Sequence, residues 1–267
     1  FKKTFVNMDQ PGLCARQMYE DWKDELGLSY EEAERATYQG LRALEAFDTR
    51  LRKLSREVLE QLEREDRLGV VVLARPYHND PGVNHEICDE LQKLGYPIFY
   101  QDMLPIDEDI LERLFGDEVR AGAFKSPLSL DDVWKNSYSE NTNRKLWAAK
   151  YTARHPNLVA LELSSFKCGH DAPIYSNIES IIEQSGTPYF CFKDIDENKP
   201  TGSIKIRIET IAYFLKRYRE DMIAQKRKRA AIEAHLAELE RKLRAGEATT
   251  FRPVVKSGVG RQPLVSV

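Results

Sequence analysis

Polar and apolar residues follow a helical period through the first part of the chain. Pro11 suits the first turn of a helix, and apolar residues then recur at intervals of four; they are Met18, Trp22 and Leu26. Gly27 is a suitable end for this helix, and Ser29 is a suitable N-cap for the next one. The second helix is predicted to run to about residue 62 as a long amphipathic helix. Its apolar positions are Ala33, Ala36, Leu41, Leu44, Phe47, Leu51, Leu54, Val58 and Leu62.

From Leu68 the pattern changes, and short apolar runs alternate with helical segments as in an α/β domain. Short apolar runs, typical of strands buried on both faces, lie at residues 69–75, 96–100, 157–163 and 188–192. Helical patterns follow them at residues 84–94, 107–115, 143–155 and 173–184. This alternation predicts a four-stranded parallel sheet with helices on both faces. The interval 116–140 has few periodic signals and is predicted to form an excursion or a lid.

A long helix is predicted from residue 203 to about residue 246. Its first part carries an apolar stripe that we expect to lie on the sheet, and its second part is expected to project or to pair with another helix. The basic run 226–229 is interpreted as a solvated helix face, because no aromatic residues interleave with it. The predicted organisation is a helical segment (1–67), an α/β domain (68–224), a projecting helix (225–246) and an extended tail (247–267).

Composition narrows the class of protein. The 267 residues include 40 Lys and Arg against 43 Asp and Glu, a balance that excludes a chain-wide basic surface, so no nucleic-acid partner is predicted. No apolar run approaches the ~20 residues of a membrane-spanning helix, so no membrane partner is predicted. The four cysteines form no CxxC pair, which excludes a zinc ribbon and favours a cytoplasmic protein over a secreted one. Because the first residue is Phe1 and no secretory signal follows it, we expect a larger polypeptide.

Residues that could bind ligands or take part in catalysis lie in the loops that follow the predicted strands. Ligands of open parallel sheets bind beyond the carboxyl ends of the strands. After the first strand, Arg75 has a guanidinium that suits a carboxylate or a phosphate, and His78 and Asp80 are spaced to form an imidazole–carboxylate pair. Asn84 is a natural N-cap for the helix that follows, and His85 would lie in its first turn.

The loop after the third strand contains the most specific candidate. Cys168 lies between Lys167 and His170, near the start of a helix, a setting that favours the thiolate needed by an iron–sulfur cluster. The alternative is a partly buried structural thiol. A cluster needs about three or four protein ligands, whereas Cys14, Cys88 and Cys191 are predicted to pack as small hydrophobic residues. The other ligands would therefore come from another segment or another chain.

The loop after the fourth strand leads into the long helix. Lys199 and Ser203 could hold an anion at this helix start, such as a phosphate of a nucleotide or of coenzyme A. A solvated, capped turn is the alternative. Neither GxxxxGK[ST] nor GxGxxG is present, so the loop is not a P-loop.

Three stretches carry a resemblance to a known family: residues 74–87, residues 129–175 with the motif SFKCGHDAP, and residues 185–218. They resemble the dehydratase-subunit-like module of large CoA-substrate-specific enzyme activase proteins, which group with 2-hydroxyacyl-CoA dehydratases, benzoyl-CoA reductases and double-cubane-cluster proteins. The resemblance spans most of residues 1–220. It implies a flavodoxin-like, doubly wound module with a 4Fe-4S cluster, which an ATP-hydrolysing activator domain of the same polypeptide supplies with low-potential electrons. Of the family's cluster cysteines, only Cys168 can be carried over.

The sequence thus leads to one main hypothesis and two rivals. The main hypothesis is a fragment of an ATP-dependent iron–sulfur reductase system acting on a CoA thioester or another substrate that is hard to reduce, within a homo-oligomer. Its candidate catalytic residues are Arg75, His78 and His170, its candidate cofactor-binding residues are Lys167, Lys199 and Ser203, and its candidate metal ligand is Cys168. The rivals are a non-catalytic interaction module and an α/β domain that binds a small molecule without redox chemistry.

Overall fold

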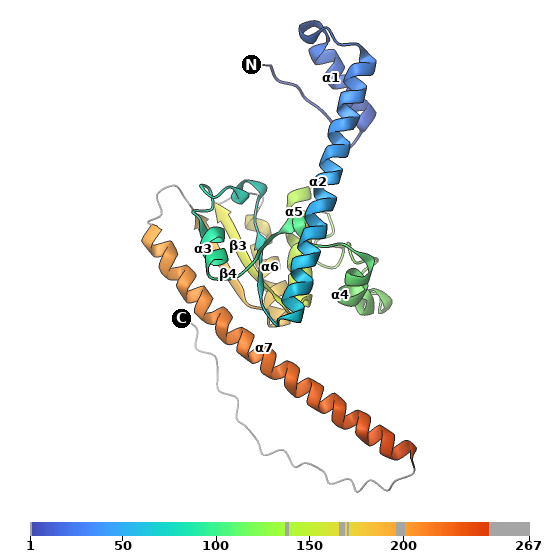
Figure 1. Ribbon diagram of the computed structural model, residues 1–267. Coiled ribbons are helices and arrows are strands. Elements are labelled where there is room, and N and C mark those ends of the chain that lie inside the picture. Colours follow the sequence, from blue (N-terminus) through green and yellow to red (C-terminus); the bar gives the residue numbers. More distant parts are fainter. Residues whose placement is uncertain (1, 137–138, 166–168, 170, 196–200, 246–267) are drawn as a thin grey trace. The chain divides into compact units, whose positions relative to one another are not determined.

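The structure is a computed structural model that describes residues 2–136, 139–165, 169, 171–195 and 201–245. By its internal contacts the chain divides into two units, residues 1–219 and residues 220–267. The predicted sites at Lys167, Cys168, His170 and Lys199 lie outside the described residues. The first unit contains the sheet and both N-terminal helices (Figure 1).

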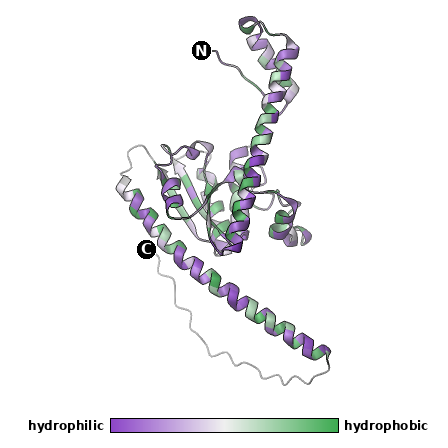
Figure 2. Ribbon diagram, viewed as in Figure 1, coloured by the Kyte–Doolittle hydropathy of each residue, from purple (hydrophilic) through white to green (hydrophobic). Residues whose placement is uncertain are grey.

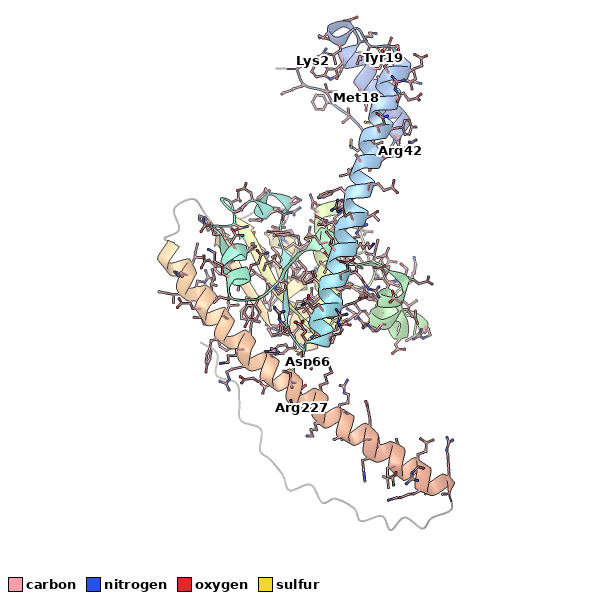
Figure 3. All side chains as sticks on the ribbon, viewed as in Figure 1. Lys2, Met18, Tyr19, Arg42, Asp66 and Arg227 are labelled. Atoms are coloured by element: carbon pink, nitrogen blue, oxygen red, sulfur yellow. The ribbon has the colours of Figure 1, made fainter. Side chains whose placement is uncertain are left out.

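The N-terminal helices form a hairpin. Helix α1 spans Pro11–Leu26 and ends at Gly27, whose φ of 62° is left-handed and therefore suits glycine. Helix α2 spans Tyr30–Arg64 and starts with a capping box, in which Ser29 Oγ accepts from the Glu32 amide and the Glu32 carboxylate accepts from the Ser29 amide. Both predicted boundaries are confirmed. Figure 3 shows Lys2, Met18 and Tyr19 beside the first half of α2, and Asp66 just beyond its end.

The predicted parallel sheet is confirmed. Its strands are β1 (Gly69–Leu73), β2 (Ile98–Tyr100), β3 (Leu158–Ser165) and β4 (Tyr189–Ile195). They pair in the order β2-β1-β3-β4, and all three pairings are parallel. This is the order of the flavodoxin-like class over its first four strands. Strand β1 is apolar and buried along its whole length, as expected for a strand covered on both faces. Figure 2 shows hydrophobic (green) residues on the strands and an alternation of green and purple along the long helices.

Helices cover the two faces of the sheet. On one face, alternate residues of β1 and β3 share a core with α2, α4 (Glu108–Arg120), α5 (Glu140–Arg154) and α6 (Tyr175–Ser185). On the other face lie α3 (Ile87–Lys93) and the first part of α7 (Thr201–Arg244). The guanidinium of Arg207 on α7, for example, stacks 3.9 Å from the ring centre of Phe192 in β4. The predicted stripe of α7 is buried at Ile204, Ile208, Ile211 and Leu215.

Two details differ from the sequence-based expectations. Helix α3 begins at Ile87, three residues later than predicted, because His85 and Glu86 have positive φ angles of 52° and 58° that a helix does not accept. Helix α4 continues to Arg120, into the interval predicted to be an excursion. The rest of that interval is attached to α5, since the buried Lys150 ammonium donates to Ser129 O at 3.0 Å and to Asp132 Oδ1 at 2.8 Å.

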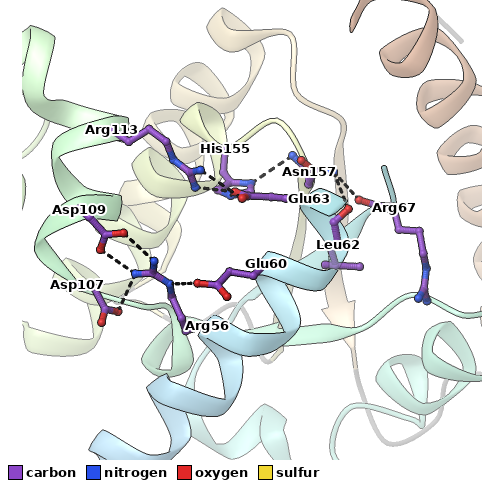
Figure 4. Close-up of polar contacts among 10 residues, drawn as sticks. All are labelled: Arg56, Glu60, Leu62, Glu63, Arg67, Asp107, Asp109, Arg113, His155 and Asn157. Atoms are coloured by element: carbon purple, nitrogen blue, oxygen red, sulfur yellow. Dashed lines mark hydrogen bonds and ion pairs between the residues drawn. The ribbon is translucent and has the colours of Figure 1, made fainter. Parts of the chain in front are cut away.

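Ion pairs connect α2 to the domain at the amino edge of the sheet (Figure 4). The Arg56 guanidinium bonds the Asp109 carboxylate at 2.7 and 2.8 Å, which joins α2 to α4. Glu63 Oε1 lies 2.8 Å from His155 Nε2 and accepts from Arg113 Nη2 at 2.6 Å. Because His155 Nδ1 accepts from the Asn157 amide, the ring proton resides on Nε2 and is donated to Glu63. Burial lowers the pKa of His155, consistent with this neutral form.

The second unit contributes the end of α7, residues 220–244, to the described chain. Ile232, Leu236 and Leu243 are exposed on it, and so are residues 226–229 of the basic run. Within the described residues, no helix combines the length and the apolar character that crossing a membrane requires.

Candidate functional site

A buried network of charged side chains lies at the carboxyl edge of the sheet. It begins with Arg75, which follows β1 and is only 7% exposed. Arg75 Nε and Nη2 lie 2.9 and 2.8 Å from Asp171 Oδ1, and Nη2 also donates to Thr142 Oγ1 at 3.2 Å. Asp171 directly precedes the short 3₁₀ helix Ala172–Ile174, whereas Thr142 lies in the first turn of α5. Arg75, which follows β1, is therefore bound both to Asp171 in the segment after β3 and to Thr142 at the start of α5.

Lys145 forms the second half of this network. Its ammonium, on α5, lies 2.7 Å from Glu162 Oε1 in β3 and 3.5 Å from Asp171 Oδ2. The side chains of all three residues have 0% exposure. The other Glu162 oxygen accepts a hydrogen bond from the Tyr189 hydroxyl in β4. Burial and the Glu162 carboxylate raise the pKa of Tyr189, so the hydroxyl keeps the proton that it donates.

Charge balance explains how the fold tolerates this network. Two cations, Arg75 and Lys145, face two carboxylates, Glu162 and Asp171. Removing each such ion from water costs several kcal/mol, and apolar residues of similar volume often give equal or greater stability. Stability therefore does not explain the network, and we take it as a candidate functional site.

His78 lies next to Arg75 and belongs to the same site. It lies in the 3₁₀ helix Pro76–Asn79, is fully buried, and accepts from the Arg75 amide through Nδ1 at 3.3 Å. Burial, followed by the nearby Lys145 ammonium, lowers the pKa of His78 to about 4. The imidazole is therefore neutral at pH 7, with its proton on Nε2. Within the described residues, Nε2 has no hydrogen-bond partner.

Two predictions about the first loop are wrong. The Asp80 carboxylate does not pair with His78, because its Oδ1 accepts from the amides of Gly82 and Val83 at 2.8 and 3.1 Å and closes a local turn. Asn84 is not the N-cap of α3. It is buried, and its Nδ2 donates to His78 O at 2.9 Å, so it supports the histidine segment instead.

Of the predicted site residues, the structure brings Arg75 and His78 together. Ser203 is exposed in the first turn of α7, and its proposed role in anion binding stays a prediction. The sequence reasoning did not select Lys145, Glu162 and Asp171 as site residues. One signal was present, because Glu162 is the single charged residue in the otherwise apolar run 158–163.

The described residues do not form a metal site. They contain no group of three or more His, Cys, Asp or Glu side chains arranged to hold a metal ion. Cys14 and Cys88 are buried, as predicted for packing residues, and burial raises the pKa of the Cys88 thiol to about 11. Cys191 is half-buried in β4. An iron–sulfur cluster at Cys168 would thus need ligands other than Cys14 and Cys88.

The fold and the buried network define a parallel α/β domain with a polar carboxyl edge. In comparisons with known families, residues 1–104 match a domain described as the CoA enzyme activase uncharacterised domain, DUF2229. Neither the curated proteins nor the solved structures gave a match. The matched segment includes Arg75 and His78, whereas Lys145, Glu162 and Asp171 lie beyond it. The sheet also needs β3 and β4, so the structural domain extends past the matched segment.

Proposed function

We propose that this chain is the dehydratase-like module of an ATP-dependent iron–sulfur reductase system, acting on a CoA thioester or another substrate that is hard to reduce. The match of residues 1–104 to a domain of CoA enzyme activase proteins supports the system. The observation that carries the proposal is the buried Arg75–Asp171–Lys145–Glu162 network, which lies at the sheet edge where open α/β folds bind ligands.

The network holds both ends of the segment that contains Cys168. Ser164, near the end of β3, lies with its Oγ 3.4 Å from Asp171 Oδ2 and also bonds the Tyr175 hydroxyl. Asp171 in turn is held by Arg75 and Lys145. We infer that these side chains fix the two described residues, Ser164 and Asp171, between which Cys168 lies in the sequence.

In this proposal Cys168 is one thiolate ligand of a cluster, which when bound supplies one-electron chemistry. The remaining ligands would come from outside this part of the chain, because Cys14 and Cys88 are buried at packing positions. Lys167 and His170 would tune the bound group, and Lys199 and Ser203 would contact an anionic substrate. Arg75 acts as a positioning residue, since its guanidinium is bound to Asp171. His78 is a candidate hydrogen-bond donor to a bound group, through the Nε2–H of its neutral imidazole.

The test is a cysteine comparison under anaerobic conditions. The chain is purified within the longer polypeptide that would supply the other ligands, together with the activator ATPase domain, and iron, acid-labile sulfide and the EPR signal of the reduced protein are measured. Cys168→Ser should lose most of the iron and the signal, whereas the matched control Cys88→Ser, at a buried packing position, should keep both. Equal iron content in the two variants, or a wild-type protein without iron, would contradict the proposal.

A second candidate is a non-catalytic interaction module of the same system. It is favoured by α2, which exposes Leu44, Phe47 and Leu54 although each is a large apolar residue. In that case Cys168→Ser leaves the activity of the assembled system unchanged. A loss of that activity in Cys168→Ser favours the reductase module.

A further inference from the structure

A row of residues at coiled-coil spacing runs along α2, and apart from Thr37 and Gly40 its members are apolar or aromatic. From Tyr30 the row steps by three or four residues to Val58, the spacing of a coiled-coil seam. Its members are Tyr30, Ala33, Thr37, Gly40, Leu44, Phe47, Leu51, Leu54 and Val58.

Helix α1 covers the first part of this row and leaves the second part open. Ala33 is buried in the hairpin, and the rings of Tyr19 and Tyr30 meet edge to face at 5.6 Å. Beyond the hairpin, Phe47 is 60% exposed and Leu54 is 48% exposed. A row that already serves helix packing thus continues without a cover.

An apolar groove adjoins the open part. It has a volume of about 400 Å³ and lies between α2 and the edge of the sheet at β2. Leu51, Leu54 and Val58 form its α2 wall, and Tyr96, Ile98 and Met103 belong to the opposite side. A helix packed on the row would be flanked by this groove.

The charged residues beside the row are complementary to those of a second copy of the same chain. Arg50 and Glu57 occupy the same flank of the row, both are exposed, and neither forms an ion pair within the described residues. In an antiparallel pair of α2 helices, Leu51 faces Leu54 of the second copy and Phe47 faces Val58 of the second copy. The same register places Arg50 of each copy beside Glu57 of the other, so two ion pairs form by symmetry.

We propose that the open row of α2 and the adjoining groove are a homodimer interface, in which two copies of this chain pair their α2 helices antiparallel. Phe47 of each copy packs at the groove of the other. This surface shares no residue with the network at the carboxyl edge, so the dimer proposal can be tested separately from the proposed reductase function.

The test measures the mass of the full chain by light scattering and sedimentation equilibrium at micromolar concentrations. Phe47→Glu should weaken self-association by more than ~10-fold, because the dimer would bury an unpaired charge. The matched control Ile206→Glu replaces a residue of α7 that is 67% exposed, and it should leave the dimer intact. Circular dichroism shows whether each variant keeps its helices.

A charge exchange tests the antiparallel register. Arg50→Glu and Glu57→Arg should each weaken the dimer, because like charges then face each other, and the double variant should restore it. In a parallel pair, Arg50 would face Ser55 instead, and the double variant would restore nothing. A wild-type chain that is monomeric, a dimer unaffected by Phe47→Glu, or the absence of charge rescue would each overturn the proposal.

Discussion

The two edges of the sheet both carry networks of charged residues, yet the networks differ in their contact with water. At the carboxyl edge, Lys145, Glu162 and Asp171 are completely buried. At the amino edge, the Arg56 guanidinium meets the Asp109 carboxylate, whose side chain is 66% exposed. Water solvates the Asp109 carboxylate whether or not its ion pair forms, whereas at the carboxyl edge each ion depends on its partners.

The difference assigns a separate role to each edge. The Arg56 pair at the amino edge joins α2 to α4, and its exposure is typical of a contact that fixes the orientation of a helix at low net energy. The carboxyl-edge ions occupy space that apolar side chains could fill with equal stability. Their placement where ligands of such sheets bind is therefore the stronger indication of function.

The largest effect is expected when the cation that both buried carboxylates share is removed. Lys145→Met keeps the volume but leaves Glu162 without its ammonium, and it should cost about 3–5 kcal/mol of unfolding free energy, as expected for a buried ion that loses its partner. Urea denaturation at pH 7 measures the loss. The double variant Lys145→Met/Glu162→Gln removes both charges and should recover most of it. A loss in the single variant no larger than that of a surface substitution would show that water reaches the network.

Much of the fold could be predicted because it rests on local periodicity. The apolar runs of the strands and the Ser29 cap need no information from distant residues. The start of α3 was missed because the Asn84 side chain is bound to His78 O instead of capping the helix, a choice that depends on tertiary contacts.

The site was harder to predict for a similar reason. Arg75 and Asp171 are 96 positions apart, and Lys145 looks like one of many charged residues on an amphipathic helix. Only the sheet order, with β1 next to β3, brings these residues together. Glu162 was the single local clue, since a charge inside a strand covered on both faces must have a partner.

A smaller effect is expected at Glu63, which lies between the two extremes of exposure. Hydrogen bonds from His155 and Arg113 lower the pKa of Glu63 from 4.5 to about 2. The folded state therefore binds a proton less readily than the unfolded state, so this contribution is complete above pH 4.5 and is lost as the pH falls toward 2. Glu63→Gln should cost about 1.5–3 kcal/mol at pH 7. The variant should also lose less stability than the wild type between pH 4.5 and 2 in urea titrations; parallel curves would contradict the assignment.

The smallest effect is expected for Arg56→Gln, which removes the ion pairs with Glu60 and Asp109 on the surface of α2. Because these carboxylates stay solvated without the guanidinium, the denaturation midpoint should shift less than in Glu63→Gln. The shift should also shrink when salt is added, since exposed charges are screened beyond ~10 Å at 0.1 M ionic strength and over shorter distances at higher salt. Lys145→Met measured in the same salt series is the matched comparison, and its loss should persist because the ions are buried. If the Arg56→Gln loss were equally large and independent of salt, the amino-edge network would be as tightly coupled to the fold as the carboxyl-edge network, and the separation of roles between the two edges would fail.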